Sequence, residues 1–172
     1  MIGRTHLAAG ILCGEAIVIV ENVTNLSDVT FIIAAAAIGS LLPDIDHPQS
    51  MMAKSNRTTK TVSGVISSVT QHRGFTHTLV FAALMWFLAS RLAAQFNIAS
   101  EYVVGGFMIG ILSHLLLDTL NDRGVMWLWP VYCKHLHILG IRTGSVIEWV
   151  LRLALNIAAT GGIAMILMQL NK

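Results

Sequence analysis

Five apolar segments separated by short polar stretches constrain the fold of this chain more than any other feature. They cover residues 7–23, 29–42, 78–94, 102–120 and 146–170. A helix needs about 20 residues, and at least roughly 17, to cross the hydrocarbon core of a bilayer. The last three segments reach this length, whereas the first two are marginal and could instead form buried or re-entrant helices. Polar residues between those two supply a turn, which favours a hairpin of two short crossings.

The composition supports a membrane protein. Charged residues make up 12% of the 172 residues and hydrophobic residues 55%, while a soluble domain carries roughly 25% charged residues. The net charge of +2 and the scattered basic residues do not indicate binding of nucleic acid. We predict an all-α, polytopic bundle of about five transmembrane helices, or four, in a single domain over residues 1–172. Loops are expected near 48–74 and 121–145, and the lipid bilayer is the expected partner.

The distribution of basic residues predicts the orientation in the membrane. Lys and Arg in short loops collect on the cytoplasmic side. If the N-terminus is cytoplasmic, that side receives Arg4, Lys54, Arg57, Lys60, Arg73, Arg123, Lys134 and Arg142. The opposite side receives Lys172 and, near a helix end, Arg91. We therefore expect a multi-pass protein whose N-terminus is cytoplasmic.

Imidazoles and carboxylates fall together at the cytoplasmic ends of the expected helices. Successive helices alternate in direction, so the end of one and the start of the next share a side. The residues placed there are His6, Asp44, Asp46, His47, His72, His77, His114 and Asp118. Ionisable residues are costly in a membrane and usually face a bundle interior. We interpret the eight as candidate ligands of one shared metal site, in which oxygen and nitrogen donors suit Zn²⁺ or Mn²⁺.

Two motifs have spacings that suit metal ligands. His114 and Asp118 are four residues apart and share one helix face, where they can chelate an ion or form a simple hydrogen bond. In the second motif, prolines bound a short bend that holds Asp44, Asp46 and His47. That bend is either a ligand motif or a helix stop. The other histidines favour metal ligation for both motifs.

The third motif runs from His72 to His77. One helix would separate residues five apart by about 140°. Gly74 favours a loop instead, in which both rings face one centre and a helix starts near Thr76. Arg73 is suited to a phosphate or a carboxylate, or it serves only the charge bias. The sequence leaves these two roles of Arg73 open.

Small residues and isolated charges give further expectations. Glycines repeat every four residues on the faces of His6 and His114, where they allow close approach of helices; they are Gly10, Gly14, Gly106 and Gly110. Glu148 and Arg152 are four apart and are expected to pair with each other. Glu15, in mid-helix, is a packing residue, a partner of ligands or part of an ion path. We expect His135 and His137 to be exposed.

The chain resembles the YdjM-type family of membrane-bound, metal-dependent hydrolases in four motifs. In order, these are RTH at 4–6, LPDIDHP at 42–48, HRGFTH at 72–77 and SHLLLD at 113–118. The resemblance covers residues 5–130. It implies a helical protein of the inner membrane of a bacterium or archaeon, with hydrolase activity.

We hypothesise hydrolysis of a phosphoester, in a lipid or lipid-linked substrate, at the cytoplasmic face. A divalent ion, Zn²⁺ first and Mn²⁺ second, would activate water, and Arg73 would bind the phosphate. Asp44 or Asp46 would act as general base or orient the ligands. The chain has no HExxH motif, which argues against the competing hypothesis of amide hydrolysis by a protease. The alternative is a non-enzymatic metal-binding membrane protein, a transporter or a regulatory partner, which Glu15 would favour.

Overall fold

The computed structural model describes residues 1–69, 73–96 and 101–171 and is helical throughout its regular elements. The α-helices are α1 (Gly3–Val20), α2 (Leu26–Leu41), α3 (Met51–Lys54), α4 (Arg57–Val69), α5 (Leu79–Gln95), α6 (Glu101–Thr119) and α7 (Val146–Leu170). Two 3₁₀ turns, η1 (Pro43–Asp46) and η2 (Phe75–His77), precede α3 and α5. Within the described ranges, β-structure is limited to isolated bridges in the loop after α6. The expected all-α class is confirmed.

Four apolar stretches are long enough to cross a bilayer. They are Gly3–Val20, Leu26–Asp46, Tyr102–Thr119 and Val146–Leu170. A fifth apolar stretch, helix α5, has 17 residues and is shorter than these four stretches. The sequence suggested that the first two segments were marginal in length, but both are long enough to cross a bilayer. Counting apolar residues alone underestimated both helices. The polar residues at the start of α1 are helical, and the side chain of Asn25 caps α2 by accepting from Ser27 N and Asp28 N.

Glycines bring α2 into backbone contact with α1 and α6. A Cβ added at Gly110 would lie 2.9 Å from Ser40 N, and one at Gly106 would lie 2.7 Å from Ile32 O. A Cβ at Gly14 would lie 2.9 Å from Ala36 Cβ. Because real Cβ atoms do not approach so closely, only glycine permits this spacing. The predicted close approach on the glycine faces is confirmed, and it fixes the helices that carry the candidate ligands.

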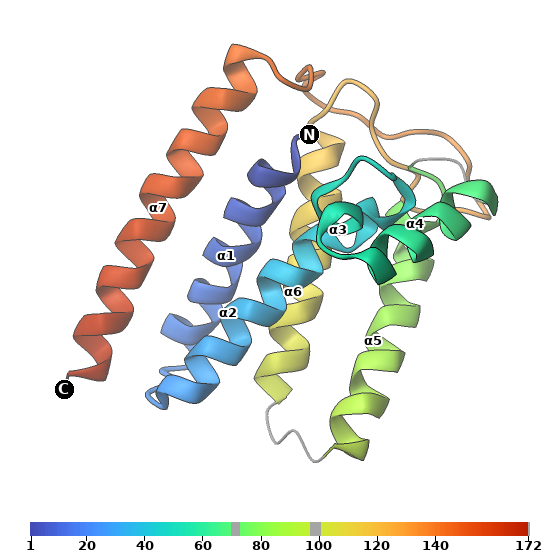
Figure 1. Ribbon diagram of the computed structural model, residues 1–172. Helices are drawn as coiled ribbons and strands as arrows, with labels where there is room; N and C mark the ends of the chain where they lie inside the picture. Colours follow the sequence, from blue (N-terminus) through green and yellow to red (C-terminus); the bar gives the residue numbers. More distant parts are fainter. Residues whose placement is uncertain (70–72, 97–100, 172) are drawn as a thin grey trace.

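The bundle has an inner and an outer set of helices. Figure 1 shows α1, α2 and α6 together, with α7 beside α1 at one flank and α5 at the other. The starts of α1, α5 and α7 and the ends of α2 and α6 gather at one end, where α3 and α4 also lie. The stretch 48–74 was expected to be a loop, but it contains α3 and α4. Ser50 starts α3 because its hydroxyl accepts from Ala53 N at 3.1 Å.

Glu148 ties the start of α1 to the start of α7. Its carboxylate accepts from Ile2 N at 2.5 Å, from Thr5 Oγ1 at 2.9 Å and from Gly144 N at 2.6 Å. The expected pair with Arg152 is wrong: no ion pair joins the two residues, both of which are described. Helix-start N–H groups have no partner in their own helix, so they compete well for a buried carboxylate.

Glu15 is fully buried in the middle of α1. A Cβ at Gly162 of α7 would overlap Glu15 Oε2, so the glycine makes room for the carboxyl group. Among the described residues, the structure gives neither carboxyl oxygen a hydrogen-bond partner. This contact favours a packing role between α1 and α7 over a role in ligand support, because Glu15 lies well away from the helix ends.

Candidate metal centre

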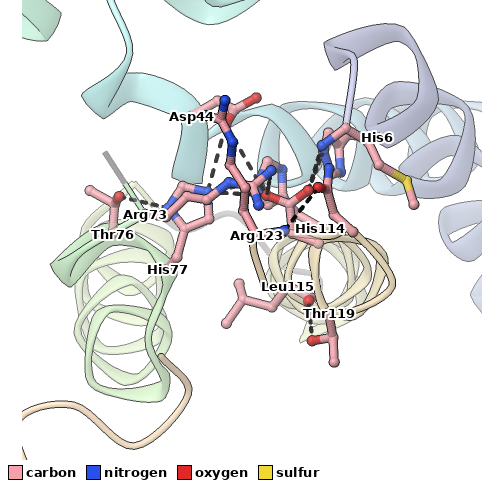
Figure 2. Close-up of polar contacts among 12 residues, drawn as sticks. His6, Asp44, Arg73, Thr76, His77, His114, Leu115, Thr119 and Arg123 are labelled. Carbon is pink, nitrogen blue, oxygen red and sulfur yellow. Dashed lines mark hydrogen bonds and ion pairs between the residues drawn. The ribbon is translucent and has the colours of Figure 1, made fainter. Parts of the chain in front are cut away.

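Four elements deliver imidazoles and carboxylates to one point at the shared end of the bundle. Asp44 comes from η1 after α2, His77 from η2 before α5, and His114 and Asp118 from the last turns of α6. One donor atom from each of these four residues lies within 4.8 Å of the others. Figure 2 shows the side chains of His77 and His114 approaching Asp44 from different helices. The expectation that alternating helix directions gather these residues at one end agrees with the geometry.

The donor atoms are spaced as ligands of one ion would be. His77 Nε2 lies 3.2 Å from His114 Nε2, and each nitrogen lies 3.6 to 3.8 Å from carboxylate oxygens of Asp44 and Asp118. A tetrahedral ion with ligands at 2.0–2.2 Å requires ligand-to-ligand distances of roughly 3.3–3.6 Å. The chemistry of the donors and their separations therefore both fit a divalent ion.

Hydrogen bonds at the far nitrogens orient the two imidazoles. His114 Nδ1 donates to Ser40 O at 2.7 Å, because a carbonyl can only accept. This contact leaves Nε2 as the nitrogen that faces the centre. His77 Nδ1 lies 3.0 Å from Thr76 Oγ1, whose hydroxyl donates to Asp46 Oδ2 at 2.7 Å. Such outer contacts fix the tautomer and ring orientation of histidine ligands.

Asp46 holds the segment that carries His77. Its Oδ2 accepts from Arg73 N at 3.0 Å and lies 3.6 Å from His77 Nδ1. Arg73 has φ +64, a left-handed conformation in which this contact is formed. Burial lowers the pKa of His77, but the hydrogen bonds and charges of Asp46 and Asp44 outweigh burial and raise the pKa to about 9. Asp46 thus lies behind the imidazole and outside the group of four.

Positive groups surround the carboxylate of Asp118. Arg73 Nη2 lies 3.0 Å from Asp118 Oδ2, and the amino group of Met1 lies 2.6 Å from Oδ1. His6 Nε2 lies 3.3 Å from the same Oδ1, and its ring stacks on His114 with centroids 3.7 Å apart. Asp118 is 1% exposed. Asp118 therefore already attracts positive groups. Arg73 is one of them, so it contacts the centre and does not only contribute to the charge bias across the membrane.

A cavity of about 320 Å³ adjoins the centre. Asp44, Arg73 and Arg123 contribute to its walls, together with the start of α1 and residues around α3. Asp44 is 15% exposed at its side chain, whereas His77 and His114 are fully buried. The carboxylate of Asp44 is thus the part of the cluster that the cavity reaches.

The remaining predicted ligands do not join the four. His47 lines the cavity, and its Nδ1 accepts from Gln49 N at 3.0 Å. His6 reaches the edge of the group through Asp118. His72 lies outside the described residues. His135 and His137 are exposed, as expected.

Sequence reasoning missed three contributors to the centre. Arg123 was counted only for orientation, although it shares the cavity wall with Arg73. Ser40 acts through its carbonyl, for which no sequence signal exists. Thr76 was expected only to cap a helix, and Thr78 caps α5 instead, since its hydroxyl accepts from Phe81 N at 3.1 Å. A threonine next to a candidate histidine ligand is the signal that could have identified Thr76.

The fold and the centre define a polytopic helical membrane protein with a buried cluster of carboxylates and imidazoles at one end of its bundle. The chain belongs to the YdjM inner membrane protein family, which matches residues 1–170. The family membership inferred from the four motifs is confirmed, whereas the hydrolase activity implied by the resemblance stays a prediction.

Of three relatives, two match most of this chain and one matches about a third of it. "Uncharacterized protein YvsG" of Bacillus subtilis (strain 168) is 35% identical over 159 residues, 92% of either chain. "Inner membrane protein YdjM" of Escherichia coli (strain K12) is 35% identical over 160 residues, 90% of this chain and 79% of the relative. "Inner membrane protein YbcI" of the same organism is 42% identical over 62 residues, 34% of this chain and 36% of the relative. No solved structure matches the chain.

Proposed function

We propose that the protein is a metal-dependent hydrolase that cleaves a phosphoester of a lipid or lipid-linked substrate at the cytoplasmic leaflet. Asp44, His77, His114 and Asp118 would hold one divalent ion, Zn²⁺ in preference to Mn²⁺. The observation that carries this proposal is the spacing of the donor atoms: five of the six pairs lie 3.2 to 3.8 Å apart, and all four atoms lie within 4.8 Å of one another. That spacing suits the tetrahedral geometry that Zn²⁺ adopts with nitrogen and oxygen ligands.

The residues around the ion would bind the substrate, activate water and position the ligands. When bound, the ion supplies Lewis-acid activation of water and offsets charge on the phosphoryl group. Arg73 and Arg123, on one cavity wall, would bind the phosphate oxygens through their guanidinium groups. Asp44, which the cavity reaches, would accept a proton or a hydrogen bond from the attacking water. Asp46 would act as a positioning residue that keeps His77 and the backbone of Arg73 in place.

The location of the centre supports a substrate that sits in the membrane surface. The cluster is formed by the turn after α2 and the last turns of α6, and the amino group of Met1 before α1 contacts it. The basic residues of the loops at this end favour a cytoplasmic location. A phosphoester at the level of the lipid headgroups would therefore meet the cavity without entering the hydrocarbon core.

A second candidate is a metal-binding membrane protein without turnover. Structural Zn²⁺ sites have four protein ligands and no open position, whereas catalytic sites keep one position for water. Asp44, His77, His114 and Asp118 are four ligands and could by themselves complete a tetrahedron. Hydrolysis requires a further position for water, and among these four residues Asp44 is the one that lines the described cavity.

Elemental analysis of detergent-purified protein tests the metal, and a panel of esters tests the reaction. We expect wild type and the exposed control His135→Ala to contain about one ion per chain, and His114→Ala to contain none. Metal-loaded wild type should hydrolyse phospholipid or lipid-linked phosphoesters and lose this activity in His114→Ala. Absence of tightly bound metal from wild type would overturn both candidates. Bound metal without turnover on phosphoesters would overturn the hydrolase and leave the second candidate.

A further inference from the structure

A second cavity lies on the outside of the bundle, between α1 and α7. Its volume is about 470 Å³. It is lined by Arg4, Leu7, Ala8, Ile11, Met51, Arg152 and Asn156. We call it the α1–α7 groove. It faces the flank formed by α7, which is the least buried of the four membrane-spanning stretches.

Among the described residues, the two arginines of the α1–α7 groove have no acidic partner. Within residues 1–69, 73–96 and 101–171, no ion pair involves Arg4 or Arg152. Glu148, the acid one turn before Arg152, instead accepts hydrogen bonds from two N–H groups and the hydroxyl of Thr5. Two unpaired cations that share a groove repel each other, so the groove has positive charge to spare for an anion. Guanidinium groups bind phosphate oxygens in a fork, which makes a phosphate the best complement.

The other side chains of the groove suit the rest of a phospholipid. Asn156 lies four residues, or about 6 Å, further along α7 than Arg152. At that depth its amide can donate to an ester carbonyl. Leu7 and Ile11, one turn apart on α1, provide apolar surface for an acyl chain. On each helix the arginine precedes the other lining residues, Leu7 and Ile11 on α1 and Asn156 on α7, so the positive charge lies nearer the shared end of the bundle than the apolar surface and the amide do.

We propose that the α1–α7 groove binds one anionic phospholipid, whose phosphate lies between Arg4 and Arg152. The site is separate from the metal centre, since it shares none of the four ligands. The two cavities nevertheless adjoin, because Met51 lines both. The side chain of Met51 packs at Gly3, where an added Cβ would lie 3.0 Å from Met51 Cγ and Sδ. This lipid site goes beyond the proposed hydrolysis, because binding in the groove needs no metal.

Native mass spectrometry of the full chain, delipidated in detergent, can measure lipid retention. The probes are phosphatidylglycerol and, as the zwitterionic comparison, phosphatidylcholine of the same acyl chains. We expect wild type to retain one phosphatidylglycerol and to prefer it to phosphatidylcholine by at least about tenfold, as expected for charge-assisted hydrogen bonds. Arg4→Gln/Arg152→Gln should lose the preference. The control Arg57→Gln/Arg142→Gln removes the same charge at exposed positions outside the groove and should keep it.

Two further arms separate the possible explanations. Glycerol phosphate carries an anionic phosphate group without acyl chains, and it should not displace the lipid at equal concentration. Equal displacement would overturn the lipid site in favour of a site for free phosphate. His114→Ala should retain phosphatidylglycerol like wild type, so failure of the metal centre leaves this result intact. Unchanged preference in Arg4→Gln/Arg152→Gln, or equal loss in the control, would overturn the proposal.

Discussion

Replacement of Gly110 by alanine should loosen the metal centre without touching a ligand. A Cβ at Gly110 would lie 2.9 Å from Ser40 N and closer still to Ala36 O, whereas ordinary contacts begin at 3.4 Å. The helices α2 and α6 must therefore separate by at least about 0.5 Å in a tightly packed interior. Overpacking of this kind costs about 1–3 kcal/mol. The shift moves Ser40 O away from His114, whose Nδ1 it holds at 2.7 Å.

Gly105→Ala is the matched control, because a Cβ at Gly105 meets nothing within 4 Å. Both variants gain the helix propensity of alanine, up to about 1 kcal/mol, so their difference isolates the packing effect. We expect Gly110→Ala to melt at a lower temperature than Gly105→Ala. Its affinity for Zn²⁺ should fall by about 10–100-fold, as when a supporting partner of a ligand is lost. Titration calorimetry and thermal unfolding in detergent measure both. Equal affinity and equal melting of the two variants would refute the argument.

Three further predictions concern a cap, a buried carboxylate and a proton. Thr78→Ala removes the cap of α5 and should cost about 1 kcal/mol in thermal unfolding, whereas Thr160→Ala, in the middle of α7, should cost less. Glu148→Gln should destabilise by about 1–3 kcal/mol, because the amide replaces one accepting oxygen by a donor; the exposed Glu21→Gln should not. Zn²⁺ binding at neutral pH should release a proton from His77, whose pKa is about 9, so affinity should rise with pH until about 9. Calorimetry in buffers of different ionisation enthalpy detects the release, and a binding heat independent of buffer would contradict it.

The location of the centre could be predicted from the sequence because it depends on helix direction alone. His77 opens a helix, while Asp44 and His114 lie near the ends of helices that run the opposite way. Any bundle of alternating helices brings such residues to one end. The spacing of His114 and Asp118 adds a local constraint, because four residues in an α-helix return to the same face. Neither inference required knowledge of the packing.

The different roles of Asp44, a candidate ligand, and Asp46, which holds the neighbouring segment, could not be predicted in the same way. The bend that carries them is a 3₁₀ turn with about three residues per turn. Residues two apart then point about 120° away from each other, so both carboxylates cannot face one ion. Asp44 faces the centre, and Asp46 faces Arg73 and Thr76. The sequence pattern does not reveal which helical period a four-residue bend adopts.

Hydrogen bonds from other segments also explain why Glu148 does not pair with Arg152. The spacing of Glu148 and Arg152 favours a pair worth a few tenths of a kcal/mol on an exposed helix. The N–H groups of Ile2 and Gly144 belong to distant or preceding segments, and they meet the carboxylate in a buried place where each hydrogen bond is worth more. Glu148 therefore binds these N–H groups and not Arg152. Arg152 is consequently free to bind an anion beside Arg4.

The shared wall at Met51 links the lipid groove to the proposed reaction, and substitution there can separate the two. If the phosphoester reaches the centre from the α1–α7 groove, Met51→Trp should obstruct the passage and lower turnover of a lipid substrate. Turnover of a small soluble phosphoester, which reaches the cavity from the aqueous side, should fall less, because Met51 lies on the wall shared with the groove and is not one of the four ligands. Met51→Ala should have the opposite effect on the lipid substrate. Activity assays on both substrates give the ratio, and an equal fall for both with Met51→Trp would mean that the two cavities are not connected in function.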